Sequence, residues 1–184
     1  MRLGLLLAAL ALPAWAGAPA DLDQGRAAVG TLKKSLKEAL VAALKTSPEA
    51  AIEVCATQAR ILAASASTSE VEVGRSALKL RNPANAPRPW VADAMKTLAA
   101  KPEDGKGLVV ALPNGKRGYV ETIVTQPMCL TCHGAKVSEP VAKALGARYP
   151  ADKAMGFVPG DFRGVFWAEL ASKLAEGPGH AALT

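Results

Sequence analysis

Residues 107–124 read GLVVALPNGKRGYVETIV, and this stretch decides the fold class. Two apolar runs rich in valine flank Asn114 and Gly115. This dipeptide readily adopts the positive φ angles of a tight hairpin turn. The stretch therefore predicts a β-hairpin, which indicates an antiparallel sheet.

The second strand of this hairpin leads directly into QPMCLTCHG, residues 126–134. Within it, Cys129, Cys132 and His133 form Cys-x-x-Cys-His, which in an exported protein is the attachment sequence of c-type haem. Each thiol can add to one haem vinyl group, and the adjacent imidazole can bind the iron. The motif predicts one covalent haem c per chain, held by Cys129 and Cys132, with His133 on the iron.

The chain begins MRLGLLLAALALPAWA, which has the basic start, short apolar run and small-residue end of a secretory signal peptide. We predict cleavage after Ala16, with residues 1–16 as the signal peptide and residues 17–184 as a single domain. The apolar run is too short to span a bilayer comfortably, and no later stretch is apolar enough. We therefore expect a periplasmic protein without an integral membrane segment.

Removal of the leader lowers the formal net charge from +6 to +5, because Arg2 is lost. The remaining 168 residues (184 minus 16) suit one domain with its own core. A positive charge favours an acidic docking partner, although the basic residues are dispersed along the chain. No nucleic-acid-binding motif is found, so we expect no nucleic-acid partner.

Helices are predicted before the hairpin. Apolar residues recur at helical spacing from Asp21 to about Lys45. Ser47 and Pro48 then provide an N-cap and a first-turn proline for a second helix to about Ala64, with Cys55 on its apolar side. The other elements expected of this α+β chain are a strand over Val71–Leu80, helices over Trp90–Ala100 and Glu139–Arg148, and a strand near Gly164–Leu170.

Three alternatives to haem stay open. A zinc site could use Cys129, Cys132, His133 and Cys55, although structural zinc sites are usually built from two ligand pairs and the second pair is missing. A redox dithiol would require a βαβ setting, whereas this motif follows a hairpin. The third alternative is a structural disulfide, although three cysteines are too few for a disulfide scaffold.

The second axial ligand of the iron is also open. Met128 is too close to the motif to reach across a haem, Met95 and Met155 are typical core fillers, and His180 lies in a tail without an obvious anchor. Cys55 is the unpaired thiol of an exported chain, and iron would stabilise its thiolate. A buried free cysteine acting as a small apolar residue explains Cys55 equally well.

Four blocks of sequence in this order, AIEVC, VGRSALKLRNPANAPRPW, QPMCLTCHG and YPADKAMGFVPGDFRG, resemble a family of exported c-type haem proteins long described as a domain of unknown function. The similarity runs from about residue 50 to Gly164. It implies a PAS-like antiparallel sheet with N-terminal helices and a covalently attached haem. In a characterised member the iron is bound by the motif histidine and a cysteine on an early helix, which correspond here to His133 and Cys55.

The family pattern GR-x-S-x-K-x-RNP includes Arg75, Lys79 and Arg81. Ser76-Ala77 stands where Thr-Ser is expected, and no acidic residue flanks Trp90. Haem propionates favour guanidinium or ammonium partners, so we predict Arg75 and Arg81 first and Lys79 second as cofactor-binding residues. Arg81→Ala should then shift the haem potential; solvated surface charges are the alternative.

The expected function is that of a periplasmic monohaem c-type cytochrome that transfers electrons or senses redox state, with an unidentified redox partner. Two filled axial positions leave no open site for catalysis, so we do not expect an enzyme. The alternative is a sensor of a diatomic gas in which the Cys55 ligand is displaced, an analogy with other PAS-like folds. A peroxidase-like activity is a weaker third hypothesis.

Overall fold

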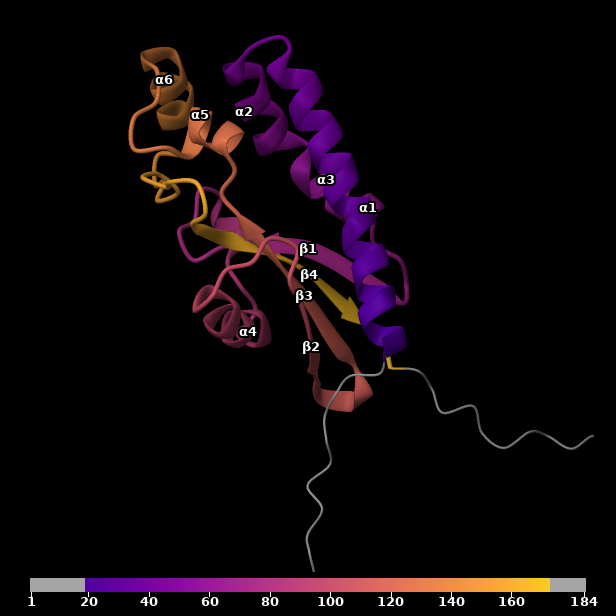
Figure 1. Cartoon of the computed structure of the whole chain (residues 1–184). Helices are drawn as coiled ribbons and strands as arrows, with labels where there is room; N and C mark the ends of the chain where they lie inside the picture. Colours follow the sequence, from indigo (N-terminus) through magenta and orange to yellow (C-terminus); the bar gives the residue numbers. More distant parts are fainter. Residues whose placement is uncertain (1–18, 173–184) are drawn as a thin grey trace, which may run out of the picture.

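The computed structural model describes residues 19–172 (Figure 1). The predicted signal peptide and His180 lie outside this range. A four-stranded antiparallel sheet in the order β1-β4-β3-β2 forms the centre. Its strands are β1 (Val71–Ser76), β2 (Gly107–Ala111), β3 (Arg117–Val124) and β4 (Phe162–Leu170). The helices are α1 (Pro19–Leu44), α2 (Pro48–Thr57), α3 (Ala59–Ser65), α4 (Pro89–Ala99), α5 (Leu130–His133) and α6 (Glu139–Arg148), with 3₁₀ turns at Pro83–Asn85, Pro113–Gly115 and Pro127–Cys129.

The predicted α+β class and the PAS-like antiparallel sheet are confirmed. Strands β2 and β3 form the predicted hairpin, paired from Gly107 opposite Glu121 to Ala111 opposite Arg117. In the turn, Asn114 has a φ of 58° and Gly115 a φ of 71°. The dipeptide therefore adopts the backbone conformation for which its residue types are suited.

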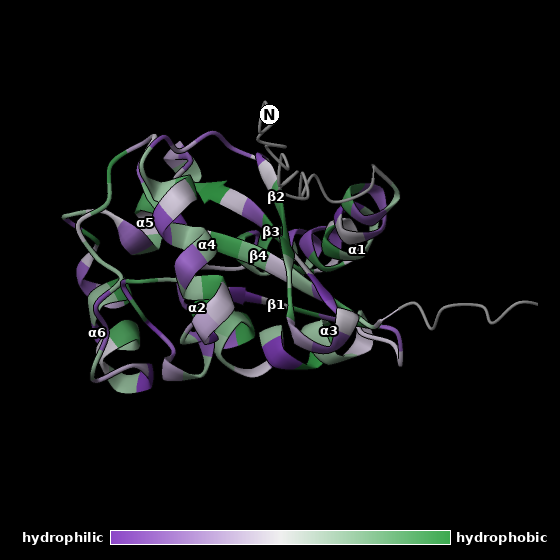
Figure 2. Ribbon diagram, turned by 90° about the horizontal axis from the view of Figure 1, so that it is seen from below, coloured by the Kyte–Doolittle hydropathy of each residue, from purple (hydrophilic) through white to green (hydrophobic). Residues whose placement is uncertain are grey.

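Helices cover both faces of the sheet. Helices α1 and α3 pack on one face through a buried cluster that includes Val29, Leu32 and Tyr119. Helix α4 packs on the other face around Met95 and Trp167, so α1 and α4 lie on opposite sides of the sheet (Figure 2). A third cluster joins α2 to α6. Among residues 19–172, no helix is both long and apolar enough to cross a bilayer.

The second predicted helix is shorter than expected. Ser47 caps α2 as predicted, and its hydroxyl accepts a hydrogen bond from the Ala50 N–H at 3.1 Å. The helix ends at Thr57, however, and α3 begins at Ala59 instead of continuing from α2 to Ala64. The Thr57 hydroxyl donates to the Glu53 carbonyl at 2.9 Å, a type of local bond that often bends a helix.

Strand β1 also ends early, at Ser76 instead of Leu80. Its last pair is Ser76 opposite Val165, after which the Ala77 N–H donates to the Asn85 carbonyl and the chain leaves the sheet. Next to this point, Gly164 has a φ of 150°, and a Cβ there would collide with the Ser76 carbonyl oxygen. Glycine thus allows β4 to approach the end of β1 closely, at the point where the chain leaves the sheet.

Candidate functional site

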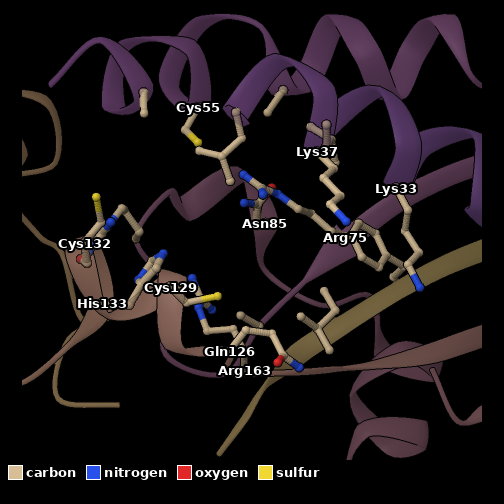
Figure 3. Close-up of a pocket in the computed structure, with 18 of the residues that line it drawn as sticks. Lys33, Lys37, Cys55, Arg75, Asn85, Gln126, Cys129, Cys132, His133 and Arg163 are labelled. Carbon is tan, nitrogen blue, oxygen red and sulfur yellow. The ribbon is translucent and has the colours of Figure 1, made fainter. Parts of the chain in front are cut away.

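A cavity of about 590 Å³ lies between α1, α2, one end of the sheet and the Cys-x-x-Cys-His motif. Its volume falls within the range of roughly 300–1,000 Å³ that is typical of small-molecule and cofactor sites. Cys55, Cys129, Cys132 and His133 all line it. Figure 3 shows Cys55 entering from α2, on the other side of the cavity from the motif residues. The structure therefore brings together all four residues predicted to attach or bind the haem.

The motif residues lie in a tight turn directly after β3. A 3₁₀ turn ends at Cys129, and the single turn of α5 contains Cys132 and His133. The backbone of the motif is fixed to a distant segment, because the Phe157 N–H donates to the His133 carbonyl at 3.0 Å. A spacing of three residues in a helical turn places two side chains on the same side, as attachment to one ligand requires.

The His133 imidazole is oriented by the backbone of the same distant segment. Its Nδ1 lies 2.7 Å from the Ala154 carbonyl oxygen, which can only accept, so Nδ1 carries the hydrogen and Nε2 keeps a lone pair. Burial, followed by the positive charges of Arg163 and Arg81, lowers the pKa of His133 to about 3. The imidazole is thus neutral, with one nitrogen available to bind a metal.

Arg81 lines the cavity, but its guanidinium is already bound to other residues of the chain. Its Nε donates to Asp152 Oδ2 at 2.8 Å, and its Nη2 donates to the carbonyl oxygens of Cys132 and Ala154. The Arg81 and Asp152 side chains are only 10% and 11% exposed. Arg81 therefore joins the segment after β1 to the motif, and its guanidinium already has a carboxylate partner within the chain.

Arg81→Ala should lower the free energy of unfolding by about 3 kcal/mol or more, because it leaves the nearly buried Asp152 carboxylate without its counter-charge. Urea denaturation of the full chain measures this change. The control is Arg148→Ala, since Arg148 pairs with Glu53 where both side chains are about half exposed, and such pairs contribute about 1 kcal/mol or less. Equal losses in the two variants would contradict the structural role of Arg81.

Of the other two predicted cationic residues, Arg75 lines the cavity and Lys79 does not. Arg75 is half-buried on β1 and lines the cavity. Lys79 is exposed and does not line it; its ammonium lies 4.9 Å from the centre of the Phe157 ring. Sequence reasoning missed Arg163, which lines the cavity with its guanidinium carbon 5.1 Å from the centre of the same ring.

The structure separates the candidates for the second axial ligand. Met95 is fully buried in the α4 cluster, and Met155 Sδ accepts a hydrogen bond from Arg81 at 3.3 Å; neither lines the cavity. Met128 lines the cavity but belongs to the same turn as Cys129. Cys55 alone among the described candidates lines it from another element.

The described residues can be compared with the three alternatives to haem. Within residues 19–172, no three histidine, cysteine or acidic side chains lie close enough together to hold a metal ion. All three cysteines are free thiols. Burial is the main cause that raises the pKa of Cys132, whereas reactive dithiols have a lowered pKa. The motif also follows a strand of an antiparallel sheet, which differs from the βαβ setting of redox dithiols.

Comparison with known proteins agrees with the family resemblance seen in the sequence blocks. The family described as Tll0287-like matches residues 19–170. A solved structure titled "Crystal structure of the cyanobacterial heme-protein Tll0287" is 25% identical, with a TM-score of 0.60, over 85% of this chain and 97% of that chain. No curated protein matches. The chain belongs to the Tll0287-like family.

Proposed function

We propose that the chain binds one haem in this cavity, covalently attached through Cys129 and Cys132, with His133 and Cys55 as the axial ligands of its iron. The observation that carries the proposal is that these four side chains, from α2 and from the turn after β3, line one cavity of about 590 Å³. The similar solved structure is described as a haem protein, which supports the same cofactor here.

The residues around the cavity fit this cofactor. Leu40, Ile52, Leu62, Leu80 and Phe166 line it, and they would contact an apolar macrocycle. His133 Nε2 has a free lone pair, and the Cys55 thiolate would be a second ligand for iron. During attachment each S–H would add across a vinyl C=C bond, so that no atom leaves and no oxidant is needed.

The proposed function is that of an exported, periplasmic monohaem c-type cytochrome for electron transfer or redox sensing. Bound haem would supply a one-electron couple. Ligation by the Cys55 thiolate would favour the ferric state and a low potential, while the hydrogen bond to Ala154 would hold His133 in one orientation. Because His133 and Cys55 would both bind the iron, the proposal includes no enzymatic reaction.

A second candidate function is the sensing of a diatomic gas. Cys55 lies in the last turn of α2, two residues before the helix ends at Thr57. A ligand at the end of an interrupted helix is easier to displace than one in the middle of a long helix, because fewer helical bonds resist its movement. Carbon monoxide binding by the reduced wild-type chain would favour this function, and lack of binding would favour the cytochrome.

The test of the proposed function is the absorption spectrum of the full chain produced in a bacterial host with a cytochrome c maturation system. We expect a haem spectrum that stays with the polypeptide after denaturation and acid-acetone extraction, in protein recovered from the periplasm and beginning at Gly17. Protein without haem, or haem that is fully extracted, would overturn covalent attachment. An uncleaved leader would overturn the predicted export.

The proposed redox partner is an acidic protein. Lys34 and Lys37 are exposed on α1 and line the cavity, and neither forms an ion pair with another residue in the described range 19–172. Opposite charges near a redox centre accelerate encounter, and salt screens the effect.

Lys34→Gln/Lys37→Gln should slow oxidation of the reduced protein by ferricyanide about tenfold at low ionic strength, because this anionic oxidant is attracted by the lysines. Stopped-flow absorbance measures the rate. The control Lys101→Gln/Lys143→Gln removes two charges from residues that do not line the cavity and should have a smaller effect. Equal rate changes in the two double variants would show that only total charge matters.

A further inference from the structure

Two guanidinium groups in the cavity form no ion pair in the part of the chain that the structure describes; Asp152, which is bound to Arg81, attracts Arg163 only weakly. Arg75 is on β1 and Arg163 is on β4, and both are half-buried. No ion pair or hydrogen bond joins either side chain to another residue between positions 19 and 172, and the only ring contact of the two is that of Arg163 with Phe157. Figure 3 shows both side chains directed into the cavity.

The other basic residues of the cavity differ from this pair. Lys33 is paired with Glu121 at 2.5 Å and Arg81 with Asp152. Lys34 and Lys37 are exposed, so water can solvate their charges. Asp104 is the one acidic residue that lines the described cavity, and its Oδ1 accepts a hydrogen bond from the Val124 N–H. Among the charged side chains that line the cavity within residues 19–172, only Arg75 and Arg163 are both half-buried and without an ion pair.

The pKa of Arg163 also indicates that its positive charge is not fully compensated in the cavity. Burial is the main cause that lowers the pKa of Arg163 to about 10, and repulsion from Arg75 and Arg81 lowers it further. Charges removed from water are stable when a counter-charge accompanies them. A ligand carrying two negative charges would supply the missing counter-charges.

We propose that Arg75 and Arg163 form the carboxylate-binding pair of this cavity and neutralise the two propionates of the haem. This inference rests on the proposed function. It replaces Arg81 and Lys79 by Arg163 as a partner of the propionates, since Arg81 is bound to Asp152 and Lys79 lies outside the cavity. Guanidinium groups suit this task because their forked donors match a carboxylate.

The first test is the midpoint potential of the purified holoprotein. A cation near the haem stabilises the reduced form, which carries one more electron, so Arg75→Met and Arg163→Met should each lower the potential. We expect the reduction equilibrium to change about tenfold, or about 59 mV for one electron. Arg75→Lys and Arg163→Lys should keep most of the wild-type potential, and they serve as variants that preserve charge if the methionine variants fold poorly.

The control for this test is Lys79→Met, which removes a charge of the same sign outside the cavity. Its effect on the reduction equilibrium should be less than about threefold. Covalent haem with an unchanged potential in both Arg75→Met and Arg163→Met would overturn this inference and leave the proposed function intact. A wild-type chain that takes up no haem would overturn both.

The second test removes the propionate charges instead of the arginines. In a full chain with Cys129→Ala/Cys132→Ala, haem can bind only without covalent bonds, and its affinity can be compared with that of haem dimethyl ester by absorbance titration. The ratio of the affinity for haem to the affinity for haem dimethyl ester should fall at least tenfold when Arg75→Met/Arg163→Met is added to this variant. An unchanged preference would overturn the role of the pair.

Discussion

Cys55→Ala is expected to remove the thiolate from the iron while leaving the haem covalently attached. Cys55 lines the cavity from α2, whereas Cys129 and Cys132 lie in the turn after β3, so the substitution changes an axial position without touching the attachment residues. The ferric spectrum should lose its thiolate character. The midpoint potential should rise, because a thiolate stabilises ferric iron more than a neutral or absent ligand does.

The expected rise in potential exceeds about 59 mV, which corresponds to a tenfold change in a one-electron equilibrium. Spectroelectrochemical titration of wild type and variant measures it. Cys55→Met should also raise the potential, since histidine and methionine together favour a high one. Met128→Leu is the control, because Met128 lines the same cavity beside Cys129. A thiolate spectrum that persists in Cys55→Ala, or disappears in Met128→Leu, would refute Cys55 as the ligand.

Cys129→Ala/Cys132→Ala is expected to abolish covalent attachment. With no thiol to add to a vinyl group, all haem should be extracted by acid-acetone, whereas the wild-type chain should retain nearly all of it. Mass spectrometry of the denatured chain should show a loss of the mass of one haem. His133 should keep its hydrogen bond to Ala154 in this variant, because neither substituted residue takes part in it, and the chain should still bind haem reversibly.

Each single variant, Cys129→Ala or Cys132→Ala, should retain one thioether and a haem spectrum shifted by the unreacted vinyl group. The control for the double variant is Cys55→Ala, which removes a thiol from the same cavity but should keep the haem covalent. Retention of covalent haem in the double variant would show that another residue makes the bond. If acid-acetone extracted all haem from Cys55→Ala, the assignment of the thioether bonds to Cys129 and Cys132 would be wrong.

Elements with local signals were predicted well. The Asn114-Gly115 turn sets the hairpin, Ser47 caps α2, and α6 has the predicted bounds Glu139–Arg148. In each case the deciding contacts lie within a few residues along the chain. Two other boundaries were not predicted. The helix break at Gln58 follows the hydrogen bond that the Thr57 hydroxyl donates to the Glu53 carbonyl. The early end of β1 at Ser76 depends on where its pairing with the distant strand β4 stops.

The residues of the candidate site also fall into those predicted from neighbouring sequence and those that only the fold brings together. The sequence by itself determined the attachment motif of Cys129, Cys132 and His133, because its residues are adjacent and their spacing carries the chemistry. The choice of Cys55 over the methionines, the commitment of Arg81 to Asp152 and the presence of Arg163 beside Arg75 in the cavity were decided only by the tertiary structure. These residues lie on separate elements, and whether an arginine is paired or free depends on which distant carboxylate the fold places within hydrogen-bonding distance.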